Sequence, residues 1–293
     1  MSQSLLKLTK QRTVLLDGGM GSELIKKGFT SGLPPESWNV DKPEIIKSIH
    51  QRYFDAGSDA VLTNSFGGNK IKLGSYGLED QCYELNKKAA ELACDIKPEH
   101  KFVGGSIGPT GKFLEPYGKY TEHEFIDAFF TQCQGLSEGG VDFILIETQY
   151  DLREAVSAVQ GAQKACQLPI LVTMTFKGTP RGYFTEMGNS VSECITELES
   201  HEISGTGANC TLDSKEMAQL VQTMKEKTSL PLIAQANAGQ PKVNSNGQIK
   251  YTQSAQDYVK YAKKIIQNGA DIIGGCCGTD PLYIRKMAQW IHK

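Results

Sequence analysis

The sequence predicts an α/β fold, a single (β/α)8 TIM barrel, and three observations support that prediction. Eight short apolar runs alternate with longer amphipathic segments along the chain. The same turn from a helix into the next strand occurs three times. Polar and cysteine residues follow several apolar runs directly, where barrel enzymes carry their sites. One barrel commonly takes ~250 residues, so we expect residues 1–293 to form one domain.

The eight apolar runs are the predicted strands of a parallel sheet. Several are apolar throughout, as strands covered on both faces are. In chain order they are Val14–Leu16, Ala60–Thr63, Phe102–Ser106, Phe143–Ile146, Ile170–Thr175, Gly205–Asn209, Leu232–Gln235 and Asp271–Gly274.

The longer segments between these runs have helical character. The first starts with Pro43 at an early helical position and stops at Gly57, which are typical start and stop signals. The predicted helices are Pro43–Ala56, Leu78–Cys94, Glu122–Glu138, Asp151–Ala165, Asp213–Lys227, Ser254–Gln267 and Pro281–Ile291. The longest irregular stretch, Asn237–Thr252, follows a strand and could cover a site.

The repeated turn places a glycine at the end of a helix, two or three residues before a strand. The three copies are Gly57-Ser58-Asp59, Gly140-Val141-Asp142 and Gly269-Ala270-Asp271. Each glycine is expected to adopt the left-handed conformation that ends a helix. This repetition favours eight βα units closed into a barrel, with an open doubly wound sheet as the alternative.

Composition and charge exclude several classes of protein. Lys plus Arg number 31 and Asp plus Glu 33. This balance gives no excess of positive charge that would indicate binding to nucleic acid or to an anionic membrane. No apolar run approaches the ~18 residues of a membrane span, and the N-terminal residues lack the apolar region of a secretory signal. We therefore expect a cytoplasmic protein whose eight cysteines are reduced, rather than a disulfide framework.

Residues whose side chains could take part in catalysis or binding follow the predicted strands. Because the carboxyl ends of barrel strands share one face, these residues should converge at one mouth. They are Asp17, Gly18 and Gly19 after the first strand, Thr63 and Asn64 at the second, Glu147 after the fourth, Asn209 and Cys210 at the sixth, Asn237 after the seventh, and Cys276 and Cys277 after the eighth.

The cysteines fall into two groups. Five lie in helical segments and are expected to be small buried hydrophobes: Cys82, Cys94, Cys133, Cys166 and Cys194. Cys210, Cys276 and Cys277 follow strands, and three thiolates are the ligand count of a catalytic zinc site with an open fourth position. Glycines around the adjacent pair would allow the sharp turn that a shared metal requires. A vicinal disulfide and a buried hydrophobic pair are the alternatives.

A zinc ion held by three thiolates is a weak Lewis acid for water and suits a soft fourth ligand such as a substrate thiol. Binding would deprotonate that thiol near neutral pH while leaving it nucleophilic. Alkylation of sulfur is the reaction that follows from this chemistry.

The chain resembles the homocysteine S-methyltransferase family from about Thr13 to Trp290. The similar motifs are Asp17–Leu24, Thr63–Phe66, Gly108–Gly111, Glu147-Thr148, Asn209-Cys210 and Gly274–Thr279, in this order. Two further segments, Ala236–Gly239 and Thr63–Leu73, look like the homocysteine-binding module of cobalamin-dependent methionine synthase.

This resemblance implies a zinc-dependent barrel with Cys210, Cys276 and Cys277 as ligands and the homocysteine sulfur in the open position. It implies that Asp17 and Glu147 hold the substrate amino group, which suits paired acceptors in a partly dry mouth. A helix N-cap is the alternative role for Asp17, and a structural ion pair is the alternative for Glu147.

The remaining site assignments follow from the same resemblance. Backbone amides near Gly18 and Gly19, with the Thr63 hydroxyl, could hold the substrate carboxylate. The Asn237 side chain could approach zinc when no thiol is bound, although asparagine after a strand is also a common turn former. No catalytic side chain is expected beyond the zinc-activated substrate thiolate, which would attack an electrophilic methyl group in line to give methionine.

The methyl donor is not named by any residue of this sequence. We expect methylcobalamin or a corrinoid protein supplied in trans as the donor, because the chain has no room for a corrinoid-binding domain. The alternative is that the chain is a fragment of a longer protein. S-methylmethionine, betaine or another donor, and a different thiol or selenol acceptor, are the alternatives. Outside this chemistry, a phosphate-binding barrel and a non-catalytic zinc- or thiol-binding module remain open.

Overall fold

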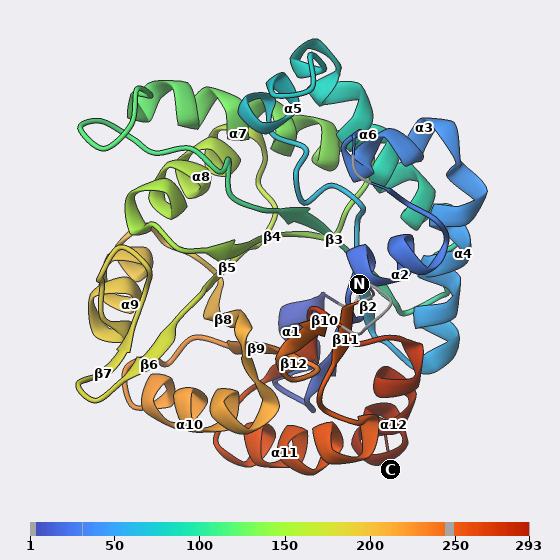
Figure 1. Cartoon of the computed structure of the whole chain (residues 1–293), viewed down its shortest axis with the longest axis vertical. Helices are drawn as coiled ribbons and strands as arrows, with labels where there is room; N and C mark the ends of the chain where they lie inside the picture. The colour runs from blue at the N-terminus through green and yellow to red at the C-terminus, as the bar shows by residue number, and fades with distance from the viewer. Residues whose placement is uncertain (1–3, 31, 244–248, 293) are drawn as a thin grey trace.

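A barrel of eight parallel strands forms the centre of the molecule. The computed structural model describes residues 4–30, 32–243 and 249–292. The strands form the inner ring in Figure 1, in the order β1-β12-β9-β8-β5-β4-β3-β2. They are β1 (Val14–Leu15), β2 (Ala60–Leu62), β3 (Phe102–Ile107), β4 (Phe143–Gln149), β5 (Ile170–Met174), β8 (Gly205–Asp213), β9 (Leu232–Asn237) and β12 (Ile272–Gly275).

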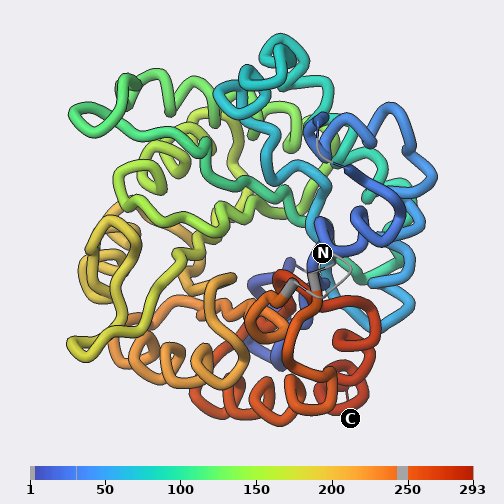
Figure 2. Tube along the Cα trace, viewed as in Figure 1, coloured from blue at the N-terminus to red at the C-terminus, as the bar shows by residue number. Residues whose placement is uncertain are grey.

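The sheet closes into a barrel where β1 and β2, the two ends of this strand order, meet. The backbone N–H of Asp59, just before β2, donates a 2.6 Å hydrogen bond to the carbonyl oxygen of Leu15 in β1. Figure 2 shows the chain running round the ring in one direction, so that its last helix lies beside its first segments. The predicted barrel is confirmed, and the open doubly wound sheet is not observed.

Eight helices form the outer ring, one after each strand (Figure 1). They are α4 (Pro43–Ala56), α6 (Cys82–Cys94), α7 (Glu122–Glu138), α8 (Leu152–Ala165), α9 (Val191–Ser200), α10 (Ser214–Lys225), α11 (Ala255–Gln267) and α12 (Pro281–Ile291). The bounds of α4, α7 and α12 are as predicted, whereas α9 was not predicted. Within the described ranges, no helix has the length and apolar character needed to cross a bilayer.

The structure contains further short elements, most of them in the loops after strands. They are α1 (Leu5–Thr9), α2 (Met20–Lys26), η1 (Pro35–Ser37), α3 (Trp38–Asp41), α5 (Lys70–Gly74), η2 (Glu79–Gln81) and two antiparallel hairpins, β6 (Lys177–Thr179) with β7 (Gly182–Phe184) and β10 (Pro241–Val243) with β11 (Ile249–Tyr251). The second hairpin occupies the stretch 237–252 that was predicted to be irregular, and residues 244–248 of that stretch lie outside the described residues.

The three repeated turns have the predicted backbone conformation. The φ angles of Gly57, Gly140 and Gly269 are +106°, +96° and +106°. This left-handed conformation strains any residue with a Cβ atom, which explains why the same residue type ends all three helices.

The amino-terminal end of the barrel is closed by packing and by one buried carboxylate. Leu5 and Leu8 of α1 pack against the side chains that fill the barrel interior at this end. Asp59 accepts hydrogen bonds from the Arg12 guanidinium at 2.6 and 2.9 Å, from Lys101 Nζ at 3.1 Å and from the backbone N–H of Leu15 at 3.0 Å. The candidate functional residues lie at the opposite, carboxyl-terminal end of the strands.

Candidate metal centre and substrate cavity

Three sulfur atoms converge at the carboxyl end of the barrel. The Sγ atoms of Cys210, Cys276 and Cys277 all lie within 4.8 Å of one another, and those of Cys210 and Cys277 are 3.9 Å apart. Two thiolates at ~2.3 Å from a tetrahedral zinc ion would be about 3.8 Å apart. The donor set and spacing therefore fit zinc with one open position. All eight cysteines are free thiols, so no vicinal disulfide joins Cys276 and Cys277.

A local irregularity of β8 turns the Cys210 side chain toward the other two sulfurs. The strand was expected to end at Asn209, but it continues to Asp213 with a register shift against β9. Within that shift Cys210 and Thr211 have φ values of +60° and +52°. Two consecutive non-glycine residues in this region cost about 1–3 kcal/mol each, a strain typical of functional sites.

Cys276 and Cys277 follow β12 in a tight turn. The Cys276 carbonyl oxygen accepts hydrogen bonds from the backbone N–H of Thr279 at 3.2 Å and from its hydroxyl at 2.7 Å. Gly278 has a φ of +81°, and a Cβ atom there would lie 2.2 Å from the ring of Tyr251, so both conformation and space require glycine. The predicted role of glycine in this turn is thus confirmed at Gly278.

Asn237, the last residue of β9, lies against the sulfur cluster. Its Oδ1 accepts a 3.1 Å hydrogen bond from the backbone N–H of Cys277. Asn237 thus lies beside the predicted ligand Cys277.

The sulfur cluster favours negative charge on Cys210. Hydrogen bonds from the Cys276 and Cys277 thiols, aided by the amide of Asn237, lower the pKa of Cys210 to about 3. The same interaction raises the pKa of Cys277 to about 11 and that of Cys276 well above its ordinary value. A cation among the three sulfurs would remove this conflict, because all three could then ionise.

A cavity of about 410 Å³ opens beside the sulfur atoms at the mouth of the barrel. Its walls include all three cysteines, together with the predicted site residues Asp17, Gly18, Gly19, Thr63 and Glu147. Segments far apart in sequence therefore meet as the barrel fold requires. The volume lies within the range of small-molecule sites.

Asp17 is buried in the cavity wall with one free oxygen. Its Oδ2 accepts a 2.9 Å hydrogen bond from the backbone N–H of Leu62, while its buried Oδ1 has no partner among the described residues. Burial, and to a smaller extent the charge of Glu147, raise its pKa well above the ordinary value, against the lowering effect of the Leu62 hydrogen bond. Helix α2 begins after Gly19, so Asp17 is not its N-cap.

Glu147 is held by two side-chain donors rather than by an ion pair. The Ser106 hydroxyl donates to Oε1 at 2.6 Å, and the Asn209 amide donates to Oε2 at 3.0 Å. Burial raises the pKa of Glu147 to about 7, against the lowering effect of Ser106. Asp17 and Glu147 are thus two buried carboxyl groups whose desolvation a substrate cation would relieve.

Asn209 joins this carboxylate to the side of the mouth that carries the sulfur cluster. Its Oδ1 accepts hydrogen bonds from the Thr148 N–H at 2.8 Å and the Thr173 hydroxyl at 2.9 Å, and its Nδ2 also donates to the Thr148 hydroxyl at 2.7 Å. Thr148 is held by these bonds with a φ of +62°. Asn209 precedes Cys210 directly, so one residue connects both parts of the site.

Two predicted carboxylate-binding groups already have partners within the protein. The Gly19 N–H donates to the Thr279 hydroxyl and carbonyl oxygens, both at 3.2 Å. The Thr63 hydroxyl accepts from the Ser106 N–H at 3.0 Å and hydrogen-bonds the Ser65 hydroxyl at 2.6 Å. Both residues line the cavity, but each would have to share its hydrogen bonds with a ligand.

The sequence did not point to three further residues of the cavity wall. Glu36 is 2% exposed, accepts a 2.6 Å hydrogen bond from the Gly67 N–H, and has a buried Oε2 with no partner in the described part of the chain. Lys72 supplies a cation, and Tyr251 covers the cavity from β11. Glu36 lies in η1 and Lys72 in α5, short helices that carry no strand-end signal, whereas Tyr251 lies in the stretch predicted to cover a site.

Comparison with known proteins places the chain in a family. A model of the family described as homocysteine S-methyltransferase matches residues 14–291. The chain belongs to the homocysteine S-methyltransferase family. The predicted family is thereby confirmed, as is the expectation of a methyltransferase enzyme at the level of the family.

Two curated relatives are much longer proteins than this chain. Methionine synthase of Mycobacterium leprae (strain TN) is 31% identical over 307 residues, covering 99% of this chain and 25% of the relative. Methionine synthase of Mycobacterium tuberculosis (strain ATCC 25618 / H37Rv) is 31% identical over 303 residues, covering 97% and 25%. The chain spans about a quarter of the length of these curated relatives.

Solved structures show the same barrel in a protein of similar length. The metallated form of the homocysteine methyltransferase MmuM from Escherichia coli has a TM-score of 0.80 and 23% identity, covering 96% of this chain and 97% of that chain. The oxidized form of the same protein has a TM-score of 0.81 and 22% identity, covering 98% of each chain. At this identity the likeness establishes the fold.

Proposed function

We propose that the chain is a zinc-dependent S-methyltransferase that transfers a methyl group to the thiol of homocysteine, giving methionine. The observation that carries the proposal is the triad of Cys210, Cys276 and Cys277 sulfurs within 4.8 Å of one another, beside a cavity with two buried carboxyl groups. Family membership supports homocysteine as the acceptor. One domain over residues 1–293 and a cytoplasmic location, where thiols stay reduced, belong to the same proposal.

A zinc ion held by the three cysteines would supply a soft Lewis acid that lowers the pKa of a substrate thiol and keeps it nucleophilic. The side chains around it have separate tasks. Asn237 accepts a hydrogen bond from the backbone N–H of Cys277, which holds that ligand in position. The cavity walls exclude water from the thiol, so a nucleophile there is only weakly solvated.

The carboxyl groups of Asp17 and Glu147 bind the ammonium group of homocysteine in this proposal. Asp17 presents an oxygen without a partner, and Glu147 is oriented by Ser106 and Asn209. An ammonium group beside them supplies the charge that offsets their burial. Backbone amides near Gly18 and Gly19 with Thr63, as first expected, or the cation of Lys72 would hold the substrate carboxylate.

Methylcobalamin or a corrinoid protein in trans is the donor proposed from the sequence, with S-methylmethionine, betaine or another donor, and another thiol or selenol acceptor, as alternatives. The printed name of the curated relatives, methionine synthase, supports methionine as the product and leaves the donor open. A panel of purified donors, scored by methionine formation, decides between them.

The metal centre is tested by replacing one ligand. Cys277→Ala should lower bound zinc below stoichiometry and reduce methionine formation at least a hundredfold, because two thiolates hold the ion less firmly than three. Zinc is measured by elemental analysis, homocysteine binding by calorimetry, and product by chromatography. Cys166→Ala is the matched control, since Cys166 is half-buried directly after α8 and outside the sulfur cluster.

A Cys277→Ala protein that keeps stoichiometric zinc and full activity would refute the metal centre. Zinc and homocysteine binding without transfer from any donor would instead favour the non-catalytic thiol-binding module. Absence of zinc from the folded wild-type protein would favour an unrelated barrel enzyme.

A further inference from the structure

Strand β8 carries extra residues at the point where it presents Cys210. Between two consecutive pairings with β9, three residues of β8 lie opposite a single residue of β9. The flanking pairs are Asn209 with Gln235 and Asp213 with Asn237. The additional length is taken up by the left-handed backbone of Cys210 and Thr211. The conformation of this irregular segment therefore decides where the Cys210 sulfur lies.

Thr211 is an unusual residue for a left-handed backbone. Its φ is +52°. Such values are rare outside glycine and asparagine, and for a β-branched side chain they are genuine outliers. A conformation of this kind costs free energy and persists only where the surrounding contacts impose it. The contacts of Thr211 should therefore show what holds the irregular segment in place.

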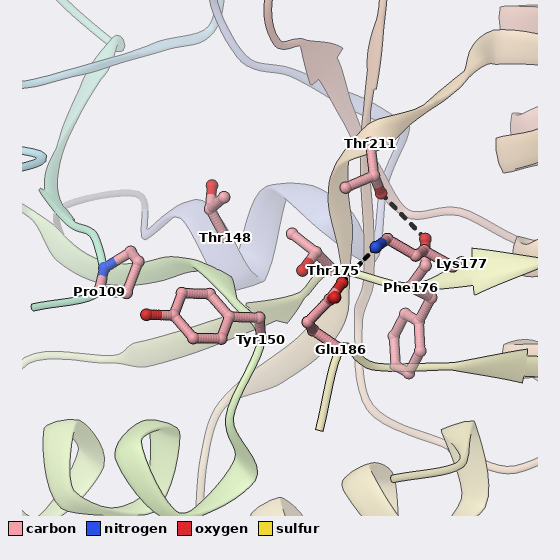
Figure 3. A pocket seen from close by; sticks show the side chains of 8 residues that line it. All are labelled: Pro109, Thr148, Tyr150, Thr175, Phe176, Lys177, Glu186 and Thr211. Atoms are coloured by element: carbon pink, nitrogen blue, oxygen red, sulfur yellow. Dashed lines mark hydrogen bonds and ion pairs between the residues drawn. The ribbon is translucent and has the colours of Figure 1, made fainter. Parts of the chain in front are cut away.

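The Thr211 hydroxyl makes the main contact. Its Oγ1 lies 3.0 Å from the carbonyl oxygen of Phe176 and 2.9 Å from that of Cys210, so its one proton is shared between two acceptors. Phe176 is buried and lies between β5 and β6. Figure 3 shows its hydrogen bond with Thr211, in the wall of a cavity beside β5. The hydroxyl thus ties the irregular segment of β8 to a buried part of the neighbouring strand connection.

The remaining contacts of Thr211 are weaker. Its side chain is half-buried, and its carbonyl oxygen accepts a 3.4 Å hydrogen bond from the exposed amide of Gln240. On the other side of Cys210, the side chain of Asn209 is fixed by its own hydrogen bonds. Cys210 is therefore held from both directions along the chain, by an amide before it and by a hydroxyl after it.

We propose that Thr211 is the positioning residue of Cys210, and that its hydroxyl holds the left-handed segment that turns the Cys210 sulfur toward those of Cys276 and Cys277. This inference rests on the proposed function, because it gives Thr211 a part in forming the zinc site. The three sulfur atoms are then in place before a metal binds, so that binding requires no rearrangement of the strand.

Three substitutions separate the hydroxyl from the backbone conformation. Thr211→Val keeps the shape of the side chain and loses the hydroxyl, and Thr211→Ser keeps the hydroxyl. Thr211→Gly loses the hydroxyl but adopts a positive φ without strain. Thr179→Val is the matched control, because it removes another hydroxyl-to-carbonyl hydrogen bond, to Gly182 at 2.8 Å in the β6–β7 hairpin.

The first readout is the rate at which zinc-loaded protein releases its metal to an excess of a chromogenic chelator. Thr211→Val and Thr211→Gly should each release zinc about tenfold to a hundredfold faster than wild type, the usual effect of losing a group that orients a metal ligand. Thr211→Ser and Thr179→Val should release it at the wild-type rate.

The second readout uses Co2+ in place of zinc. The charge-transfer absorption of a thiolate-bound Co2+ ion grows with the number of sulfur ligands. Thr211→Val and Thr211→Gly should lose roughly a third of this absorption per bound ion, because one of three soft ligands withdraws. Thr211→Ser should retain it. Urea unfolding of the metal-free proteins is the structural control, in which Thr211→Gly should resemble wild type because glycine is unstrained at this φ.

Wild-type zinc release and cobalt absorption in Thr211→Gly would overturn the inference, and this variant decides the matter even if Thr211→Val does not fold. A lower resistance to urea without faster zinc release would assign Thr211 a structural role only. Losses in Thr211→Ser as large as in Thr211→Val would rule out the hydroxyl as the cause. If wild-type protein binds no zinc, the proposed function fails and this inference fails with it. If wild type binds zinc and the variants match it, only the inference fails.

Discussion

Asn209 is the residue on which the geometry of the mouth most depends. It uses both amide protons and its carbonyl oxygen at once, on Glu147, Thr148 and Thr173. Cys210 follows it in the strand irregularity. A displacement of this one side chain would therefore move both the carboxylate proposed to hold the substrate and the backbone that carries Cys210, a proposed metal ligand.

Replacing Asn209 with alanine should raise the homocysteine KM at least tenfold with a smaller change in kcat. The reason is that Glu147 loses a hydrogen-bond donor and Thr148 loses the acceptor that holds its left-handed backbone. Steady-state kinetics with zinc analysis measures both. Thr173→Val removes one hydrogen bond of Asn209 and should have a smaller effect. Equal KM values for the three proteins would show that the network is only structural.

The sequence predicts part of this site and misses another part for a physical reason. Cysteines and carboxylates after apolar strands could be found because strand ends converge in a barrel. The left-handed backbone of Thr148 and Cys210 could not, because no glycine marks those positions and tertiary hydrogen bonds hold them. The sequence did not indicate Glu36, because this residue lies in η1, within the connection between β1 and α4, and does not directly follow a strand.

Among the secondary-structure elements, the helices that end in glycine are the most regular. A glycine with positive φ directly follows α4, and one lies two residues beyond the last residue of α7 and of α11. The missed helix α9 also carries a signal, since Ser190 and Glu193 form a capping box at its start. The β6–β7 hairpin has no such signal, because its strands are three residues long and largely exposed.

Gly140→Ala should lower the free energy of unfolding by about 1–2 kcal/mol through backbone strain alone. The nearest atom to an added Cβ there would be the Cys94 sulfur at 3.8 Å, so no steric clash contributes. Chemical denaturation measures the change. Gly21→Ala is the control: Gly21 lies in α2 with open space around it, and alanine there should be neutral or stabilising. Equal effects of the two substitutions would contradict the assignment of a strained turn.

At the scale of the whole molecule, the contacts around Asp59 that stabilise the barrel and the residues of the candidate site lie at opposite ends of the barrel. The amino-terminal end is packed by α1 and tied by Asp59, which joins Arg12 before β1, Lys101 before β3 and His292 after α12. The carboxyl-terminal end holds the sulfur cluster and the cavity beside it. This division separates variants that unfold the protein from those that disable it.

Asp59→Asn should therefore lower stability by about 2 kcal/mol near neutral pH and leave homocysteine affinity unchanged. Burial raises the pKa of Asp59, but hydrogen bonds from Arg12 and Leu15 and the charge of Lys101 outweigh it and lower the pKa from 3.8 to about 2. A lowered carboxyl pKa stabilises the folded state above the unfolded value. The contribution is lost as pH falls from about 4 to about 2.

Urea unfolding of wild type and Asp59→Asn between neutral pH and pH 2 measures this difference. The two stability curves should converge as pH falls through that window. Curves that remain parallel would show that the Asp59 charge does not tie the end of the barrel.

The raised pKa values of Asp17 and Glu147 imply that substrate binding releases protons. Near neutral pH a fraction of the Glu147 carboxyl groups carries a proton in the free protein, because burial raises its pKa to about 7, and burial shifts the pKa of Asp17 in the same direction. An arriving ammonium group favours the ionised forms, so protons are expelled as the amino acid enters. The thiol adds its own proton to this release. Substrate capture would thus acidify the surrounding buffer, and its heat would vary with the ionisation enthalpy of that buffer.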